Sequence, residues 1–289
     1  MPPLTWRDCA LSSLNTSAAL EYEIEWIGDE MINPSKMARL VLNLAWLEFK
    51  AQRKDTFLGW GWIVLWPALQ AGGLLLVVGI LRGETGVISL RTMLATYLGV
   101  LVWSTAVGVI MGNLGILQTH REMIVHIRFP FIVLPVVDVT VKYLVFLTQL
   151  LIGVGLWLFL VPHATWGLML ADVMVFVVIF YLALIATAWI VSLLGLAAPD
   201  LSFVLPPLFL FLLTLSPIFH SGQEALSPFV RYLNNVSPLS FVINSWYAAI
   251  DVYGTGSQFP WVLLIGAVVA LAGAYKLAMA MYREVAKVL

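Results

Sequence analysis

Six stretches of the sequence contain no Asp, Glu, Lys or Arg, and they constrain the fold more than any other feature. The stretches are 57–81, 92–117, 143–161, 173–198, 201–219 and 261–275. A helix that crosses a membrane needs about 20 consecutive, mostly apolar residues, because it has to pass through about 30 Å of hydrocarbon. We therefore expect an all-α integral membrane protein with six transmembrane helices.

With their flanking residues, the expected spans cover 57–81, 92–117, 130–161, 167–198, 201–219 and 261–282. The segment 226–250 is also apolar, but Pro228, Arg231 and Pro238 interrupt it. A short, interrupted segment of this kind fits a re-entrant hairpin better than a seventh span. We place this hairpin on the outer side of the membrane, between spans five and six.

The composition excludes several other classes of protein. Of the 289 residues, 61% are hydrophobic and only 11% are charged, which is too few to cover a water-facing surface. The net charge of −1 gives no electrostatic reason to expect a nucleic-acid partner. A single cysteine, Cys9, excludes a disulfide framework within one chain.

The distribution of Lys and Arg predicts the orientation in the membrane. If both termini are cytoplasmic, outer loops hold only Arg82, Arg91 and Arg231, and the other basic residues lie inside. This is the bias of the positive-inside rule, so we expect cytoplasmic termini. Residues 1–33 are acidic and lack the apolar core of a signal peptide, which predicts a cytoplasmic extension before a transmembrane domain at 34–289.

An amphipathic helix is expected at 36–54, just before the first span. Its apolar side chains recur at helical spacing, and basic side chains occupy the opposite face. The expected apolar face comprises Met37, Leu40, Val41, Leu44 and Leu47. Such a helix lies along the cytoplasmic interface, either as a simple anchor or with a role in substrate entry or partner docking.

The loop 118–129 joins spans two and three on the cytoplasmic side. It mixes charged residues with Met123, Ile124, Val125 and Ile127, which is typical of a short helix presented to another protein. The alternative, which the composition alone favours, is an ordinary interfacial turn. We single out four residues here as candidates for partner contact: His120, Arg121, Glu122 and Met123.

The chain lacks a GxxxxGK[ST] loop, so it is not expected to bind ATP by the usual phosphate cradle. Asp138, Lys142 and Asp172 are the charged residues to consider for an ion relay, but they lie near the ends of the expected spans and not at mid-membrane, which disfavours a relay. Asp138 and Lys142 could pair because they are four residues apart. His163 and His220, together with Asp172, could form an outward-facing acid/base or metal site. Their spacing matches no pattern of catalytic residues that would favour an enzyme.

Aromatic side chains concentrate in two of the expected spans. They are Trp60, Trp62 and Trp66 at the start of span one, and Phe203, Phe209, Phe211 and Phe219 along span five. Aromatic belts at the headgroup level account for many membrane aromatics. Aromatic faces inside a channel would instead offer stacking surfaces to the apolar faces of sugar rings.

Four motifs resemble those of ABC-type polysaccharide export permeases, the family of O-antigen, teichoic-acid and capsule exporters. The segment FLGWGWIVLWP at 57–67 is similar to the family's "LGxxWxxLxP" opening. The segment HIRFP at 126–130, followed by Leu134-Pro135, resembles its basic and Phe-Pro stretch after span two. Ser216-Pro217-Ile218-Phe219 and Ser237-Pro238-Leu239 resemble motifs at the end of span five and in the outer hairpin.

This resemblance implies a transport subunit rather than an enzyme, located in the bacterial inner membrane. Two copies of the chain would pair with two copies of a cytosolic ATPase, which would bind ATP and Mg, while this chain binds no cofactor. Residues 36–54 and 118–129 would dock the ATPase, and the aromatic residues of spans one and five would line the polymer path. A polyprenyl-diphosphate-linked polysaccharide would enter near Arg53 and Lys54, whose charges could attract the diphosphate.

Two alternatives follow from the same residues. The first keeps the exporter architecture but changes the cargo to a drug or another small amphiphile. The second is an integral membrane enzyme that modifies glycans, which would require His163 or His220.

Overall fold

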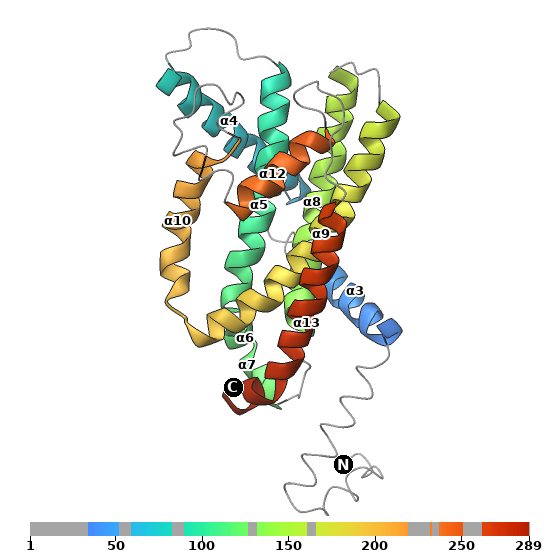
Figure 1. The fold of residues 1–289 in the computed structure, drawn as a ribbon, viewed down its shortest axis with the longest axis vertical. Coiled ribbons are helices and arrows are strands. Elements are labelled where there is room, and N and C mark those ends of the chain that lie inside the picture. Colours follow the sequence, from blue (N-terminus) through green and yellow to red (C-terminus); the bar gives the residue numbers. More distant parts are fainter. Residues whose placement is uncertain are drawn as a thin grey trace, which may run out of the picture.

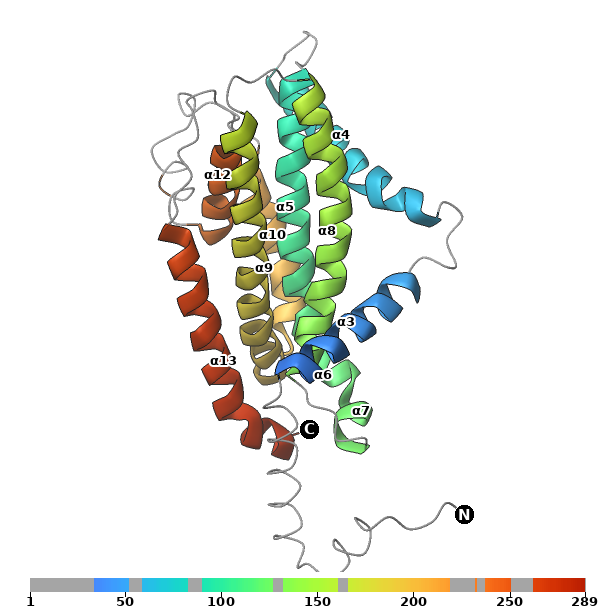
Figure 2. The ribbon, with the colours of Figure 1, turned by 90° about the vertical axis from the view of Figure 1, so that its right-hand side faces the viewer.

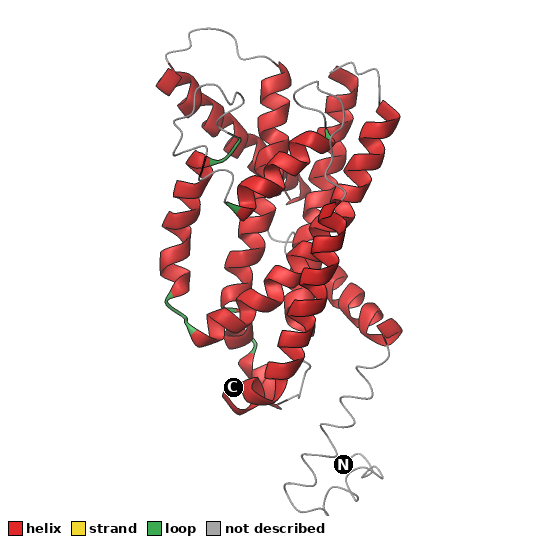
Figure 3. Ribbon diagram, in the orientation of Figure 1, coloured by secondary structure: helices red, strands yellow, loops and turns green. Residues whose placement is uncertain are grey.

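The computed structural model describes residues 34–51, 59–82, 90–126, 132–160, 166–218, 232, 237–250 and 262–288. Within these ranges the chain consists of helices and short turns and contains no strand, as Figure 3 shows. The helices are α3 (Pro34–Ala51), α4 (Trp62–Arg82, after a 3-10 turn at Gly59–Gly61), α5 (Leu90–Leu114), α6 (Ile116–Thr119), α7 (Arg121–His126), α8 (Val133–Leu160), α9 (Trp166–Ala197), α10 (Leu201–Leu215), α12 (Pro238–Ala249) and α13 (Val262–Val288). The expected all-α class is therefore confirmed for the described part of the chain.

Three long helices, α5, α8 and α9, pack against one another and form the centre of the molecule (Figure 1). The remaining helices pack around this centre: α13 runs along α9, α4 and α10 lie against α5, and α3 lies against α8 (Figure 2). The core between the central helices contains large side chains that are almost fully buried, including Leu98, Phe146 and Trp157. Packing of apolar helix faces against one another therefore defines the fold.

By length and composition, three described segments can cross a membrane: 91–114, 133–159 and 169–197. They correspond to the second, third and fourth expected spans. The apolar part of α10 is shorter, since its 15 residues at about 1.5 Å each reach only about 22 Å. It also contains Pro206 and Pro207, each of which removes one hydrogen bond from the helix.

The second expected span differs from the prediction at its C-terminal end. We expected one continuous helix over 92–117, but α5 ends at Leu114 and the chain bends at Gly115 before α6 begins. No charged residue or proline occurs near position 115 to indicate the break. As a result, α6 and α7 extend from the end of α5 as separate short helices.

The segment expected to form a hairpin is described only in its second half. There α12 begins at Pro238, and the hydroxyl oxygen of Ser237 caps it by accepting a hydrogen bond from the Ser240 backbone at 3.4 Å. The helix is buried against α5 and α9, with Trp246 and Ile250 inaccessible to solvent. The first half of the segment, apart from Tyr232, lies outside the described residues.

Helix α3 begins at Pro34, close to the expected start, and the face that it buries matches the predicted one only in part. Val41 is buried, and Met37 and Leu44 pack against the same cluster, but Leu40 and Leu47 are exposed. Ala45 and Phe49, which were not predicted, are buried instead. The reason is that α3 packs against the first turns of α8 through contacts at i and i+4. The prediction assumed that the apolar residues would share one lipid-facing stripe.

Candidate functional site

Two of the three tryptophans predicted to line a path lie exposed on α4. Trp62 is partly exposed, and Trp66, one helical turn further along, is 58% exposed. Trp60 belongs to the 3-10 turn before α4, and its side chain lies outside the described residues. The buried side of α4 packs on α5, and Gln149 of α8 donates a hydrogen bond to the backbone carbonyl oxygen of Ile63 in α4.

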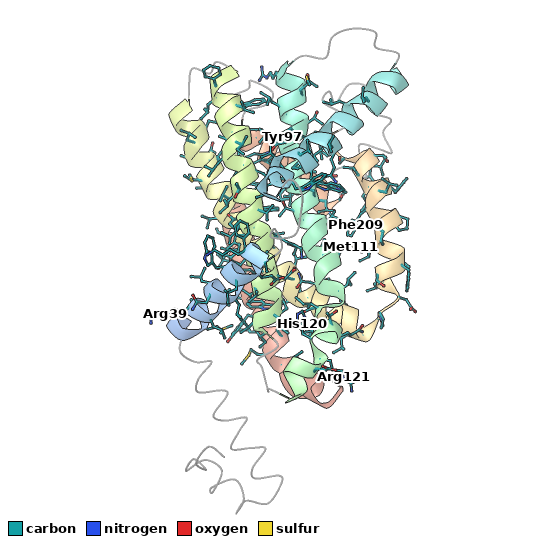
Figure 4. All side chains as sticks on the ribbon, turned by 180° about the vertical axis from the view of Figure 1, so that it is seen from behind. Arg39, Tyr97, Met111, His120, Arg121 and Phe209 are labelled. Atoms are coloured by element: carbon teal, nitrogen blue, oxygen red, sulfur yellow. The ribbon has the colours of Figure 1, made fainter. Side chains whose placement is uncertain are left out.

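The predicted phenylalanines of α10 do not share one environment. Phe203 is 80% exposed and Phe211 is also exposed, but Phe209 is only 9% exposed and belongs to the core that α10 shares with α5. Figure 4 shows Phe209 close to the part of α5 that carries Met111. Phe219 lies outside the described residues. Phe209 thus anchors α10, whereas Phe203 and Phe211 are available to a ligand, to lipid or to another chain.

Helices α4 and α10 both pack against α5, but Figure 2 shows α4 leading outward from the bundle on one side of α5 while α10 lies behind it. Within the described part of the chain, each makes more extensive contact with α5 than with the other. The structure therefore places the exposed aromatic side chains of both helices around α5. It does not bring them together into a closed cleft.

The candidate coupling residues lie at the end of the molecule where α5 leads into α6 and α7 (Figure 4). Arg121 and Glu122 form the first turn of α7, and both side chains are exposed. His120 is exposed between the two helices, and its Nδ1 lies 2.9 Å from the carbonyl oxygen of Ile116. The side chain of Met123 lies outside the described residues. The chain forms a short helix at 121–126 rather than an ordinary turn, and the first turn of this helix carries exposed charged side chains.

The predicted diphosphate residues Arg53 and Lys54 lie outside the described residues, just after the end of α3. The described part of α3 carries exposed basic residues of its own, Arg39 and Lys50. The Lys50 ammonium lies 4.7 Å from the centre of the Trp46 ring, in a cation–π contact. Positive charge is therefore present along the exposed side of this helix.

The expected pairing of Asp138 with Lys142 is confirmed, since the two side chains form an ion pair along α8. Sequence reasoning missed the third member of the cluster, Asn113 of α5. Its Nδ2 donates hydrogen bonds to Asp138 Oδ2 at 2.7 Å and to the Val109 carbonyl oxygen at 2.9 Å. A buried amide in an otherwise apolar helix was the available signal, but its partner could not be identified without the packing of α5 on α8.

The residues considered for an enzyme or metal site are not assembled within the described part of the chain. Asp172 is buried in α9, whereas His163 and His220 lie outside the described residues. No group of three or more His, Cys, Asp or Glu side chains suited to a metal ion occurs among the described residues.

No protein-family model matches the sequence, and no curated protein is similar to it at a significant level. An assignment of function therefore rests on the residues of this chain and on their arrangement.

Proposed function

We propose that this chain is the membrane-spanning permease subunit of an ATP-driven ABC transporter. It would export a lipid-linked, O-antigen-like polysaccharide from the cytoplasm across the bacterial inner membrane. In this proposal the chain has six spans, an outer re-entrant hairpin and cytoplasmic termini. Two copies act with two copies of a cytosolic ATPase, because the sequence contains no GxxxxGK[ST] loop of its own.

The observation that carries the proposal is the position of α7. This short helix interrupts the connection between α5 and α8, two helices that are long and apolar enough to cross a membrane. Its exposed Arg121 and Glu122 contribute nothing to an apolar core, but they suit a complementary polar groove on a cytosolic protein. A partner that moves α7 could therefore act directly on two spanning helices.

The exposed aromatic side chains support a carbohydrate as the cargo. Trp62 and Trp66 of α4 and Phe203 and Phe211 of α10 are exposed on two helices that pack against α5. Aromatic rings can stack on the apolar C–H faces of successive sugars without fixing any one of them. This property suits a polymer that has to slide along its path.

The cations near the end of α3 support a lipid diphosphate as the carrier. Lys50 is exposed in its last turn, and Arg53 and Lys54 follow three and four residues later in the sequence. Two or more cations close together attract a diphosphate through charge-assisted hydrogen bonds. The polyprenyl chain of such a carrier would remain in the surrounding lipid.

The experiment that tests the proposal is affinity purification of the tagged chain from native membranes. Mass spectrometry would then identify the co-purifying proteins and any bound glycan. We expect an ATPase with a GxxxxGK[ST] loop and a polyprenyl-linked polymer. Recovery of the ATPase with a small amphiphile would mean that the exporter carries this amphiphile and not a polysaccharide. Recovery of an active chain without an ATPase would refute the transporter assignment.

A further inference from the structure

The end of α5 and the following α6 are held from two sides within a few residues. Gly112 and Asn113 contact α8, whereas Leu114 and Gln118 contact α9. We call this set of contacts the α5 clasp. On the α8 side it includes Asp138 and Lys142, and on the α9 side it includes Gly195.

On the α8 side the contacts are polar. Asn113, which is fully buried, donates a hydrogen bond to Asp138 Oδ2 at 2.7 Å, and Asp138 also pairs with Lys142. A Cβ atom at Gly112 would occupy the place of the Lys142 ammonium group. The absence of a side chain at Gly112 therefore lets the ion pair sit directly against α5.

On the α9 side the two backbones touch. A Cβ atom at Gly195 would lie 2.6 Å from the carbonyl carbon of Leu114 and 2.8 Å from its Cα atom, which is closer than real atoms approach. The Nε2 of Gln118 also donates a hydrogen bond to the Gly195 carbonyl oxygen at 3.4 Å. Only glycine at position 195 permits this approach of α9 to the end of α5.

The two helices that hold the α5 end are also bonded to each other. The Tyr143 hydroxyl of α8 donates to the Val177 carbonyl oxygen of α9 at 2.7 Å. The hydroxyl groups of Thr140 and Tyr181 lie 2.9 Å apart and form a second link between the same helices. The clasp, α8 and α9 thus form one connected set of contacts.

We propose that the α5 clasp transmits movement of α7 to α8 and α9, with Asn113 and Gly195 as its positioning residues. This inference rests on the proposed function, in which an ATPase moves α7. Asn113 lies before the bend at Gly115 and holds the end of α5 on α8, whereas Gln118 lies beyond the bend and holds α6 on α9. Without both contacts, α6 and α7 could move and leave α8 and α9 in place. With both contacts, a displacement of α7 has to carry the ends of α8 and α9 along.

Movement of α9 would in turn reach α10 and its exposed aromatic side chains. The turn between the two helices spans only 198–200 and is closed by a hydrogen bond from the Leu201 backbone to the Ala198 carbonyl oxygen at 3.2 Å. Because the connecting turn is only three residues long, α10 cannot stay in place if the end of α9 moves far. The clasp therefore links α7 to α10, which carries two of the exposed aromatic side chains of the proposed substrate path.

The first test uses the full-length chain alone, in lipid nanodiscs. Cys9 is replaced by Ser, and spin labels are attached through Glu122→Cys on α7 and Ala198→Cys at the end of α9, both at exposed positions. Electron paramagnetic resonance then measures the distance between the labels. We expect one narrow distance peak, lost in an Asn113→Leu variant but retained in the control Gln149→Leu, which removes a different inter-helix hydrogen bond. A narrow peak in Asn113→Leu would overturn the proposal.

The second test uses the complex with its ATPase and an exchange of residues across the clasp. Asn113→Asp places two carboxylates together, Asp138→Asn leaves Lys142 without its carboxylate, and the double variant restores one amide and one carboxylate. We expect each single variant to assemble normally but to hydrolyse about ten-fold more ATP per exported chain, and the double variant to recover. If both single variants hydrolyse as much ATP per exported chain as the wild type, the proposed role of the clasp is refuted.

The two tests separate failure of the clasp from failure of the proposed function. If the wild-type chain forms no complex with an ATPase, the proposed function fails, and with it the role of the clasp in coupling. The distance measurement still decides whether Asn113 fixes α7 relative to α9. If the complex exports polymer while Asn113→Leu leaves the distance unchanged, only the clasp is refuted.

Discussion

The side-chain amide of Gln149 on α8 donates a hydrogen bond to the backbone carbonyl oxygen of Ile63 in α4, at 2.5 Å. Ile63 is four residues before Pro67, which lies inside α4. In an α-helix this carbonyl would accept a hydrogen bond from the backbone of residue 67, but proline has no N–H group to give. Gln149 therefore supplies, from another helix, the donor that Pro67 lacks.

Gln149→Leu should destabilise the protein by about 1–3 kcal/mol, because it leaves the buried Ile63 carbonyl without a donor. Pro67→Ala provides a backbone N–H at position 67, so Gln149→Leu should cost less than about 1 kcal/mol in that background. The measurement is a double-mutant cycle of unfolding free energies in detergent. Equal costs of Gln149→Leu in both backgrounds would show that Gln149 does not compensate for Pro67.

Trp62→Ala and Phe209→Ala should have different effects, although the sequence predicts the same role for both. Trp62 is exposed on α4, so its loss should slow polymer export while changing stability by less than about 1 kcal/mol. Phe209 is buried against α5, so its loss should cost about 3 kcal/mol or more. Export assays and thermal unfolding of the same preparations would check both effects. Normal export by the Trp62 variant would argue against an aromatic path on α4.

The sequence predicts where the helices lie because long apolar runs without charge are compatible with little else. It also predicts the pairing of Asp138 with Lys142, since a spacing of four residues fixes their relationship within one helix. Both predictions depend on local geometry. The start of α3 near Pro34 belongs to the same category.

Relationships between helices could not be predicted from the sequence. Asn113 meets Asp138 only because α5 and α8 are rotated so that these two side chains face each other. Which face of α3 is buried likewise depends on the rotation of the helix about its axis and on the angle at which it crosses α8. The burial of Phe209 could not be predicted either. Phe203 and Phe211 lie in the same apolar stretch of sequence, but both are exposed, whereas Phe209 is buried. Apolar residues occur on every side of α10, so their spacing does not indicate which side is buried.

Gly195→Ala should destabilise the protein by about 1–3 kcal/mol or more, because the added methyl group would overlap the backbone of Leu114. Gly155→Ala is the matched control, since it adds the same group to an exposed position of α8 with open space around it. The control should leave stability unchanged or raise it slightly, because alanine favours helices. Thermal unfolding of both variants would check this, and equal stabilities would contradict the close contact of α9 with α5.

Arg121→Glu should uncouple ATP hydrolysis from export without preventing insertion of the chain into the membrane. Arg121 is exposed in the first turn of α7, so reversing its charge changes the surface offered to the ATPase but removes nothing from the apolar core. Lys276→Glu is the control, because it makes the same change of charge at an exposed position on α13.

Mutating a charge at the rim of an interface mainly changes the association rate and its dependence on salt. We therefore expect weaker ATPase binding by Arg121→Glu at low ionic strength, measured by pull-down, with the difference from the wild type shrinking as added salt screens the charges, and more ATP hydrolysed per exported chain. If Lys276→Glu had an equal effect, the loss would reflect overall charge, and α7 would not be the docking element.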